Sequence, residues 1–258
     1  MGLLQNRSVV ITGAASGVGR ASALRFVAEG ARVVCADVRK DWLDVTVTSI
    51  AAAGGTAVGV RCDVTDSDEV DAAVAAAVEH FGRLDVMFNN AGISSPRRGM
   101  LLEDHTTEDF DRLVAVNGRG VFNGCRAAVT QFKAQGDGGV IVNTASLAGM
   151  ISWGSVVYGA TKGMVIQLTR ALASEVAPHG IRVNSISPGG MVTNFGIAPG
   201  ESPPELTPEV VERLKTLHPL GRVITPEDCA DGALFLASDL AANVTGTNLP
   251  IEGGYLTR

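Results

Sequence analysis

Short apolar runs alternate with longer helix-forming segments along most of the chain. The first apolar run covers residues 8–12, and a helix-forming segment follows at residues 20–29. Later apolar runs end at turn or polar residues and are predicted as strands, at residues 32–36, 56–61, 84–88, 138–144, 181–186 and 247–251. This alternation, with no internal repeat or linker, predicts one doubly wound parallel α/β sheet of about seven strands flanked by helices.

Further helices are predicted between the strands, at residues 39–53, 65–80, 106–135, 155–177 and 226–237. Residues 190–220 are rich in Pro and Gly and break the rhythm, so they are predicted to form a lid. The prediction is a single α/β domain over residues 1–258, with the lid at about residues 190–220.

The composition of the chain argues against nucleic-acid-binding and membrane proteins. The chain has 258 residues, is 46% hydrophobic and carries a formal net charge of −6 with no basic block, which argues against nucleic acid or an anionic membrane as a partner. No apolar run approaches the roughly 18 residues that a membrane helix needs, and residues 1–8 lack the features of a signal peptide. We therefore expect a soluble, cytoplasmic protein.

The cysteines and histidines do not predict a metal site. The four cysteines are scattered, with no Cys-x-x-Cys pair and no His at ligand spacing. No His-Glu-x-x-His sequence is present either. Buried free thiols are the better interpretation, and no bound metal is expected.

A glycine-rich turn follows the first predicted strand. Thr12 leads into Gly13-Ala14-Ala15-Ser16-Gly17-Val18-Gly19. Gly13 permits a tight turn, Gly17 lets the backbone approach a bound group, and Gly19 leaves room for the helix against the strand. Free N–H groups at the start of this helix can then face a pyrophosphate, which predicts a dinucleotide site.

Asp37 ends the second predicted strand, twenty residues after Gly17. A carboxylate there can accept hydrogen bonds from the ribose hydroxyls of an adenosine and would repel a 2′-phosphate, which favours NAD over NADP. The alternative is that Asp37 does not contact a cofactor and only ends the strand or caps the next helix. Arg39 is the residue that can soften the preference for NAD.

Other strand ends carry small or amide side chains. Asp63 and Val64 follow the third strand, and Asn89-Asn90-Ala91-Gly92 follows the fourth, where such residues suit a turn that touches adenine and ribose or form a plain loop. Asn117 lies within a long predicted helix, where Asn is unfavourable by propensity. Either it packs there without a function or it is retained for its amide.

Tyr158 and Lys162 are four residues apart on a predicted helix and therefore share one face. The chain has only two tyrosines and four lysines, so this spacing is more specific than the glycines. Together with Thr12 to Gly19, Asn89 to Gly92, Asn117, Ser146 and Pro188-Gly189 through Thr193, it resembles the short-chain dehydrogenase/reductase family in its single-domain branch. The resemblance covers nearly the whole chain, in motif order.

The resemblance implies hydride transfer between a nicotinamide and a secondary alcohol or ketone, with Tyr158 as acid/base. A free tyrosine has a pKa of about 10, and the charge of Lys162 and the oxidised nicotinamide would lower it. Ser146 would hold the substrate oxygen, and Asn117 would break its helix to fix a water that connects Lys162 to solvent.

The resemblance also implies the residues that bind the cofactor. Lys162 would bind the nicotinamide ribose beside Tyr158, and Met191 and Thr193 would contact the carboxamide. The remaining candidates line the path of the dinucleotide: Gly13, Ser16, Gly17, Val18, Gly19, Asp37, Asp63, Val64, Asn90, Ala91, Gly92 and Pro188. Singly, several of these residues also fit ordinary structural roles, such as a turn at Ser146 or a cap at Thr193.

The substrate is predicted only as a class. Apolar residues flank the reacting groups and favour a hydrophobic or cyclic alcohol, although they also fit core or lid packing: Met150, Ile151, Trp153, Met191, Phe195 and Ile197. A 3-oxoacyl-acyl-carrier-protein reductase is the alternative activity, disfavoured by Ser16 and Asp37. A non-catalytic dinucleotide-sensing protein is less favoured because Tyr158 and Lys162 are both present. A sugar-nucleotide epimerase fits poorly.

Members of the family usually form homotetramers, so the resemblance also implies that this chain forms a homotetramer.

Overall fold

Seven parallel strands form one sheet in a computed structural model that describes residues 2–97, 99–193, 195 and 207–257. The strand order is β3-β2-β1-β4-β5-β6-β7. This confirms the predicted doubly wound parallel sheet. Its strands are β1 (Ser8–Thr12), β2 (Arg32–Asp37), β3 (Thr56–Arg61), β4 (Val86–Asn89), β5 (Gly139–Thr144), β6 (Ile181–Pro188) and β7 (Asn248–Ile251).

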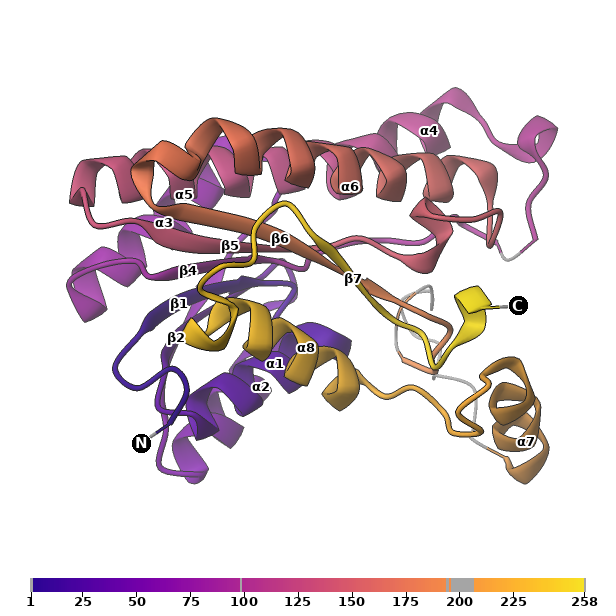
Figure 1. The fold of residues 1–258 in the computed structure, drawn as a ribbon, viewed down its shortest axis with the longest axis horizontal. Helices are drawn as coiled ribbons and strands as arrows, with labels where there is room; N and C mark the ends of the chain where they lie inside the picture. Colours follow the sequence, from indigo (N-terminus) through magenta and orange to yellow (C-terminus); the bar gives the residue numbers. More distant parts are fainter. Residues whose placement is uncertain (1, 98, 194, 196–206, 258) are drawn as a thin grey trace.

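Helices cover both faces of the sheet (Figure 1). One layer holds α3 (Ser67–Phe81), α4 (Thr107–Val114), α5 (Gly120–Gln135) and α6 (Val156–Val176). The other layer holds α1 (Gly17–Ala28), α2 (Lys40–Ala52) and α8 (Pro226–Ala237). Helix α7 (Pro208–Leu217) lies apart from both layers near the C-terminus.

Strand β1 is covered by helices on both faces of the sheet. Its side chains alternate between the two layers: Val10 packs in the core beneath α3 and α5, and Val9 and Ile11 pack in the core beneath α1 and α8. All three are fully buried. A strand buried on both faces is apolar at consecutive positions, which accounts for the continuous apolar run in the sequence.

The strand order reverses at β1, because β2 lies on one side of it and β4 on the other. The segments that leave the carboxyl ends of β1 and β4 therefore diverge toward opposite layers, and the point between them is named the crevice. In open parallel sheets this is where ligands bind. The fold places the glycine turn and residues 89–92 at this point.

Three segments differ from the sequence prediction. Helix α1 begins at Gly17 rather than at residue 20, and the predicted long helix at 106–135 is divided by a π-helical turn at Ala115–Arg119. The predicted lid contains α7, whose start is marked by the Thr207 cap and Pro208 in the first turn. The lid residues 194 and 196–206, including Ile197, lie outside the described residues.

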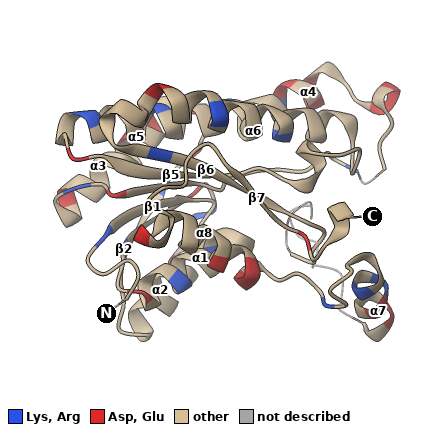
Figure 2. Cartoon of the chain, viewed as in Figure 1, with Lys and Arg blue, Asp and Glu red and all other residues tan. Residues whose placement is uncertain are grey.

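The structure shows where the charged residues and the cysteines lie in the described part of the chain. Lys, Arg, Asp and Glu lie mainly on helices and loops, and the strands carry few of them (Figure 2). The predicted buried thiols are confirmed, because all four cysteines are buried and unpaired. Within the described residues no helix is long and apolar enough to span a bilayer, and no cluster of His, Cys, Asp and Glu is arranged to hold a metal ion.

Candidate active site

The glycine turn connects β1 to α1 at the crevice. Gly13 has φ 69° and Gly17 has φ 52°, a region that side-chain-bearing residues rarely adopt. A Cβ added at Gly19 would lie 2.1 Å from the carbonyl oxygen of Gly13, so the helix start fits against the turn only without a side chain. The roles predicted for Gly13 and Gly19 thus match the geometry.

The start of α1 is open toward the crevice. Ser16 occupies the N-cap position but its side chain makes no capping hydrogen bond, and the first turn holds no acidic residue. A Cβ added at Gly17 would meet only the Thr193 side chain, at 3.9 Å. This cradle of uncapped N–H groups, beside a helix dipole, fits the pyrophosphate of a dinucleotide.

Asp37 lies at the carboxyl end of β2 and is held by two backbone amides. Its Oδ2 accepts a hydrogen bond from the Ala15 N–H at 3.0 Å, and its Oδ1 accepts one from the Arg39 N–H at 2.9 Å. The residue is 6% exposed. The structure therefore places a fixed carboxylate against the glycine turn, as the spacing predicts.

Arg39 borders the same site. Its guanidinium lies over the Trp42 ring at 4.1 Å from the centroid and donates a hydrogen bond to Ser16 Oγ at 2.7 Å. Its Nε lies 3.8 Å from Asp37 Oδ1. The cation is thus engaged by Ser16, Trp42 and Asp37, and its charge partly offsets that of the carboxylate.

The turn after β4 is joined to the neighbouring strands by side-chain hydrogen bonds. The Thr12 hydroxyl accepts from the N–H groups of Asn90 and Ala91 at 3.0 and 3.1 Å. Asn90 Nδ2 donates to the Thr12 carbonyl at 3.1 Å, and its Oδ1 accepts from Thr144 Oγ1 at 3.2 Å. Asn90 therefore fixes this turn in the crevice.

Ser146, Tyr158 and Lys162 meet at the carboxyl edge of the sheet. Ser146 follows β5, whereas Tyr158 and Lys162 lie on one face of α6. Burial raises the pKa of Tyr158 to about 12, and a side-chain hydrogen bond with Ser146 opposes that shift. The structure thus brings together the phenol and the hydroxyl predicted to act on substrate.

Lys162 is buried beside Tyr158. Its Nζ donates to the Thr144 carbonyl at 2.8 Å and lies 5.8 Å from the centroid of the Tyr158 ring. Burial lowers the pKa of this amine to about 8. A buried ammonium with one protein acceptor retains the capacity to donate further hydrogen bonds to a bound group.

Asn117 occupies the π-helical turn between α4 and α5. Its Oδ1 accepts from the Ile93 N–H at 2.8 Å, and its Nδ2 donates to the Ile93 carbonyl at 2.9 Å and to Thr161 Oγ1 at 3.2 Å. The helix is interrupted here as predicted, and the amide is retained for specific contacts. Its role in holding a water stays a prediction.

Asp63 and Val64 follow β3 at the same edge of the sheet. Asp63 Oδ1 accepts hydrogen bonds from the backbone N–H and the hydroxyl of Thr65 at 2.9 and 2.8 Å. The Val64 carbonyl accepts from Asn123 Nδ2 at 2.9 Å. Their assignment to the cofactor stays a prediction, because these contacts also serve the local turn.

The segment after β6 returns to the crevice. Pro188 ends β6, and Met191 packs against the buried core. Phe195 packs over Tyr158 with ring centroids 5.7 Å apart and an interplanar angle of 57°. Thr193 lies near Gly17 and Phe195 lies on Tyr158, so residues of this segment contact both the cradle and Tyr158.

Beyond the Ser146 loop is an apolar cavity of about 310 Å³, lined by Ile151, Leu217, Tyr255 and Leu256. Of the predicted apolar residues, Ile151 lines it, whereas Trp153 lies against Gly190 and Met150 Sδ contacts Asn248. No sequence pattern marks Leu217, Tyr255 or Leu256 as lining residues. They come from α7 and the C-terminus, which no local pattern connects to residue 151.

Comparisons with known proteins find relatives that match nearly the whole chain. A family model described as Enoyl-(Acyl carrier protein) reductase matches residues 13–256. A 2,5-dichloro-2,5-cyclohexadiene-1,4-diol dehydrogenase of Sphingobium indicum is 41% identical over 98% of this chain and 97% of its own. A 3beta-hydroxysteroid dehydrogenase 1 of Eggerthella lenta is 42% identical over 97% of this chain and 94% of its own.

A solved structure is also similar to this chain in fold. A crystal structure of a short-chain type dehydrogenase/reductase from Mycobacterium marinum superposes with a TM-score of 0.88 at 36% identity, covering 99% of this chain and 97% of that one. Sequence similarity and fold similarity both extend along nearly the whole chain. The chain therefore belongs to the short-chain dehydrogenase/reductase family.

Proposed function

We propose that this protein is an NAD-dependent dehydrogenase that transfers hydride between nicotinamide and an apolar or cyclic secondary alcohol or ketone. The observation that carries the proposal is the cluster of Ser146, Tyr158 and Lys162 beside the glycine cradle, in which Ser146 and Lys162 are buried and Tyr158 is half-buried. A bound nicotinamide supplies the hydride acceptor or donor. The chain supplies the orientation of the alcohol and the transfer of its proton.

Tyr158 is proposed as the acid/base. Its phenol is protonated in the free protein, because burial raises its pKa to about 12. Lys162, with a pKa of about 8, carries a positive charge at neutral pH, and that charge favours the phenolate when a proton is taken from an alcohol. Ser146 would donate its hydroxyl to the substrate oxygen and fix the distance to Tyr158.

Support for NAD comes from Asp37. Its buried carboxylate faces the glycine turn and is well placed to accept hydrogen bonds from ribose hydroxyls. A 2′-phosphate there would meet a like charge in a partly desolvated site. Arg39 lessens this repulsion but is already engaged by Ser16.

Support for an apolar substrate comes from the cavity lined by Ile151, Leu217, Tyr255 and Leu256. Its volume of about 310 Å³ suits a ring system. Two relatives are named for cyclic alcohols, a cyclohexadiene diol and a hydroxysteroid. The cavity and those names favour a cyclic or steroid-sized alcohol.

The test is NADH formation across secondary alcohols: short aliphatic, cyclic, terpenoid, steroid and 3-hydroxyacyl thioester. In Tyr158→Phe, loss of the acid/base should lower turnover by about 10²–10⁴-fold. NADH affinity, followed by fluorescence, should stay unchanged because the phenol hydroxyl is not needed for the cradle. Retained turnover in Tyr158→Phe would refute the mechanism, whereas NADH binding without turnover on any substrate would favour a sensing role.

A homotetramer is proposed for the assembly. Large apolar side chains are exposed on the helices that family members pair between subunits, including Phe110, Phe122 and Met164. Unpartnered apolar surface of this kind is typical of interfaces. Light scattering should therefore give a mass near four chains, and an exclusively monomeric protein would contradict the proposal.

A further inference from the structure

Two buried serines join the loop after β4 to the start of the catalytic helix. The hydroxyls of Ser95 and Ser155 are hydrogen-bonded to each other although the residues are sixty positions apart in the chain. Ser95 is 9% exposed and Ser155 is 8% exposed. A hydroxyl pair sheltered from water is a specific contact, because each group would lose a partner if the other were absent.

Ser155 transmits this contact to Tyr158. It is the N-cap residue of α6, and its Oγ accepts a hydrogen bond from the Tyr158 N–H at 3.3 Å. Tyr158 therefore lies in the first turn of its helix, where the backbone depends on the cap for a partner. The Ser95 hydroxyl fixes the orientation of the group that holds this N–H.

A second connection reaches the carbonyl side of Tyr158. Thr161 Oγ1 donates to the Tyr158 carbonyl at 2.8 Å and accepts from Asn117 Nδ2 at 3.2 Å. Asn117 in turn clamps both backbone groups of Ile93. The loop segment Ile93 to Ser95 is thus tied to the backbone of Tyr158 on both sides.

We propose that Ser95 is a positioning residue for Tyr158, acting through Ser155 to fix the first turn of α6 against the loop after β4. The proposal rests on the proposed function in that it takes Tyr158 as the acid/base. Ser95 does not touch the reacting atoms. Its effect is on how closely the phenol is held against Ser146, and a small displacement there lowers the rate of a proton transfer strongly.

The neighbouring residue provides a matched control. Ser94 is on the same loop, and its hydroxyl donates to the Ser95 carbonyl at 3.0 Å without contacting Ser155. Ser94→Ala removes the same atom from the same segment. A general loosening of the loop would therefore appear in both variants, whereas loss of positioning would appear only in Ser95→Ala.

In steady-state assays with the best alcohol of the panel, Ser95→Ala should lower kcat by about tenfold while NADH affinity stays unchanged. Ser94→Ala should behave as the parent. In a Ser155→Ala background, adding Ser95→Ala should cause no further loss, because the contact is already gone. A kcat within twofold of the parent in Ser95→Ala, or an equal loss in Ser94→Ala, would overturn the proposal.

A second measurement is independent of turnover. The chain has only two tyrosines, so labelling with 3-fluorotyrosine gives two fluorine resonances, assigned with Tyr255→Phe. In Ser95→Ala the Tyr158 resonance should move, and its pKa should fall toward the ordinary value as water reaches the phenol. An unchanged Tyr158 titration would overturn the positioning role. If the parent oxidises no alcohol, the proposed function fails, and this titration still decides the role of Ser95.

Discussion

Asp37 is the carboxylate to which we assign the proposed preference for NAD, and its surroundings bear on that preference. Both of its oxygens are already fixed by backbone N–H donors, from Ala15 and Arg39. The carboxylate therefore does not need to be reorganised when a ribose binds. A preorganised, buried acceptor discriminates more strongly than a mobile one, because the unsuitable ligand cannot move it aside.

We predict that Asp37→Ser weakens NAD use and relieves the barrier to NADP. The KM for NAD should rise by about tenfold, since a charge-assisted hydrogen bond to the ribose is lost, and NADP should become a usable cofactor. Asp41→Ser, an exposed acid in the first turn of α2, is the control and should change neither value. Equal affinity of the parent for NADH and NADPH would contradict the role given to Asp37.

Lys162 shows how much a buried charge can cost in stability. Its folded-state pKa of about 8 lies below the ordinary 10.5, so the unfolded chain binds more protons between these values. Stability therefore rises with pH through this window and is lowest where the buried amine is charged in both states. The shift corresponds to about 3 kcal/mol against the folded protein below pH 8.

We predict that Lys162→Met abolishes turnover but stabilises the fold by about 2 kcal/mol at pH 7, after allowing for the lost bond to Thr144. The gain should shrink toward pH 10, where the parent lysine is neutral in the folded protein. Urea unfolding at both pH values measures this. Lys215→Met on exposed α7 should show no such gain, and a Lys162→Met protein less stable at pH 7 would contradict the assignment.

At the scale of elements, the sequence predicts those strands and helices that have a local pattern of apolar and turn residues. The sequence predicts every described strand of the sheet within about two residues, because buried strands are short apolar runs bounded by turn residues. Helix α7 is not predicted, because it lies inside the Pro- and Gly-rich segment, although Thr207 and Pro208 are a start signal. The observed start of α1 at Gly17 differs from the predicted start at residue 20, because a glycine can belong to both the turn and the helix.

Interactions between elements are less visible in the sequence. The sequence marks Asn117 as a candidate because Asn is unfavourable in a helix, and the π-helical turn explains its position. Ser95 and Ser155 carry no comparable signal, since serines suit loops and caps anywhere. Their pairing depends on how β4 and β5 deliver two distant segments to one edge, which is a property of the tertiary fold.

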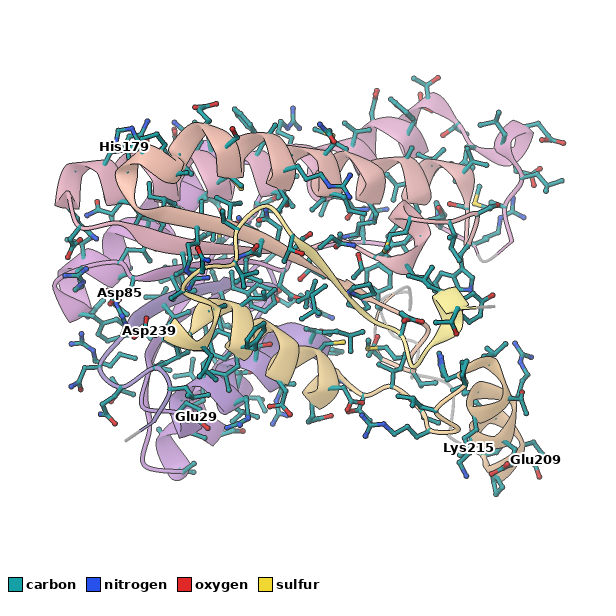
Figure 3. The ribbon with its side chains drawn as sticks, viewed as in Figure 1. Glu29, Asp85, His179, Glu209, Lys215 and Asp239 are labelled. Atoms are coloured by element: carbon teal, nitrogen blue, oxygen red, sulfur yellow. The ribbon has the colours of Figure 1, made fainter. Side chains whose placement is uncertain are left out.

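At the scale of the whole molecule, the candidate active site and a buried ion-pair network lie at opposite edges of the sheet. The glycine turn, Asn90, Ser146 and α6 start at the carboxyl ends of the strands. At the amino ends Asp85 is 5% exposed and accepts hydrogen bonds from the Ser8 N–H at 2.8 Å, Arg83 Nε at 2.8 Å and Arg7 Nη1 at 3.5 Å. Asp85 and Asp239 lie together at one end of Figure 3, with α7 at the other end.

This separation predicts a variant that loses stability without losing catalysis. Asp85→Ala leaves the buried Ser8 N–H unpaired and removes the shared partner of Arg7 and Arg83, so the free energy of unfolding should fall by about 3 kcal/mol. Asp239→Ala removes an acid whose side chain is 86% exposed and should cost no more than about 0.5 kcal/mol. Urea unfolding gives both values, and kcat at a temperature where both variants are folded should match the parent. A kcat that fell in proportion to stability would show that the two edges are coupled, because rigidity at the amino ends of β1 and β4 would then be needed to hold the crevice.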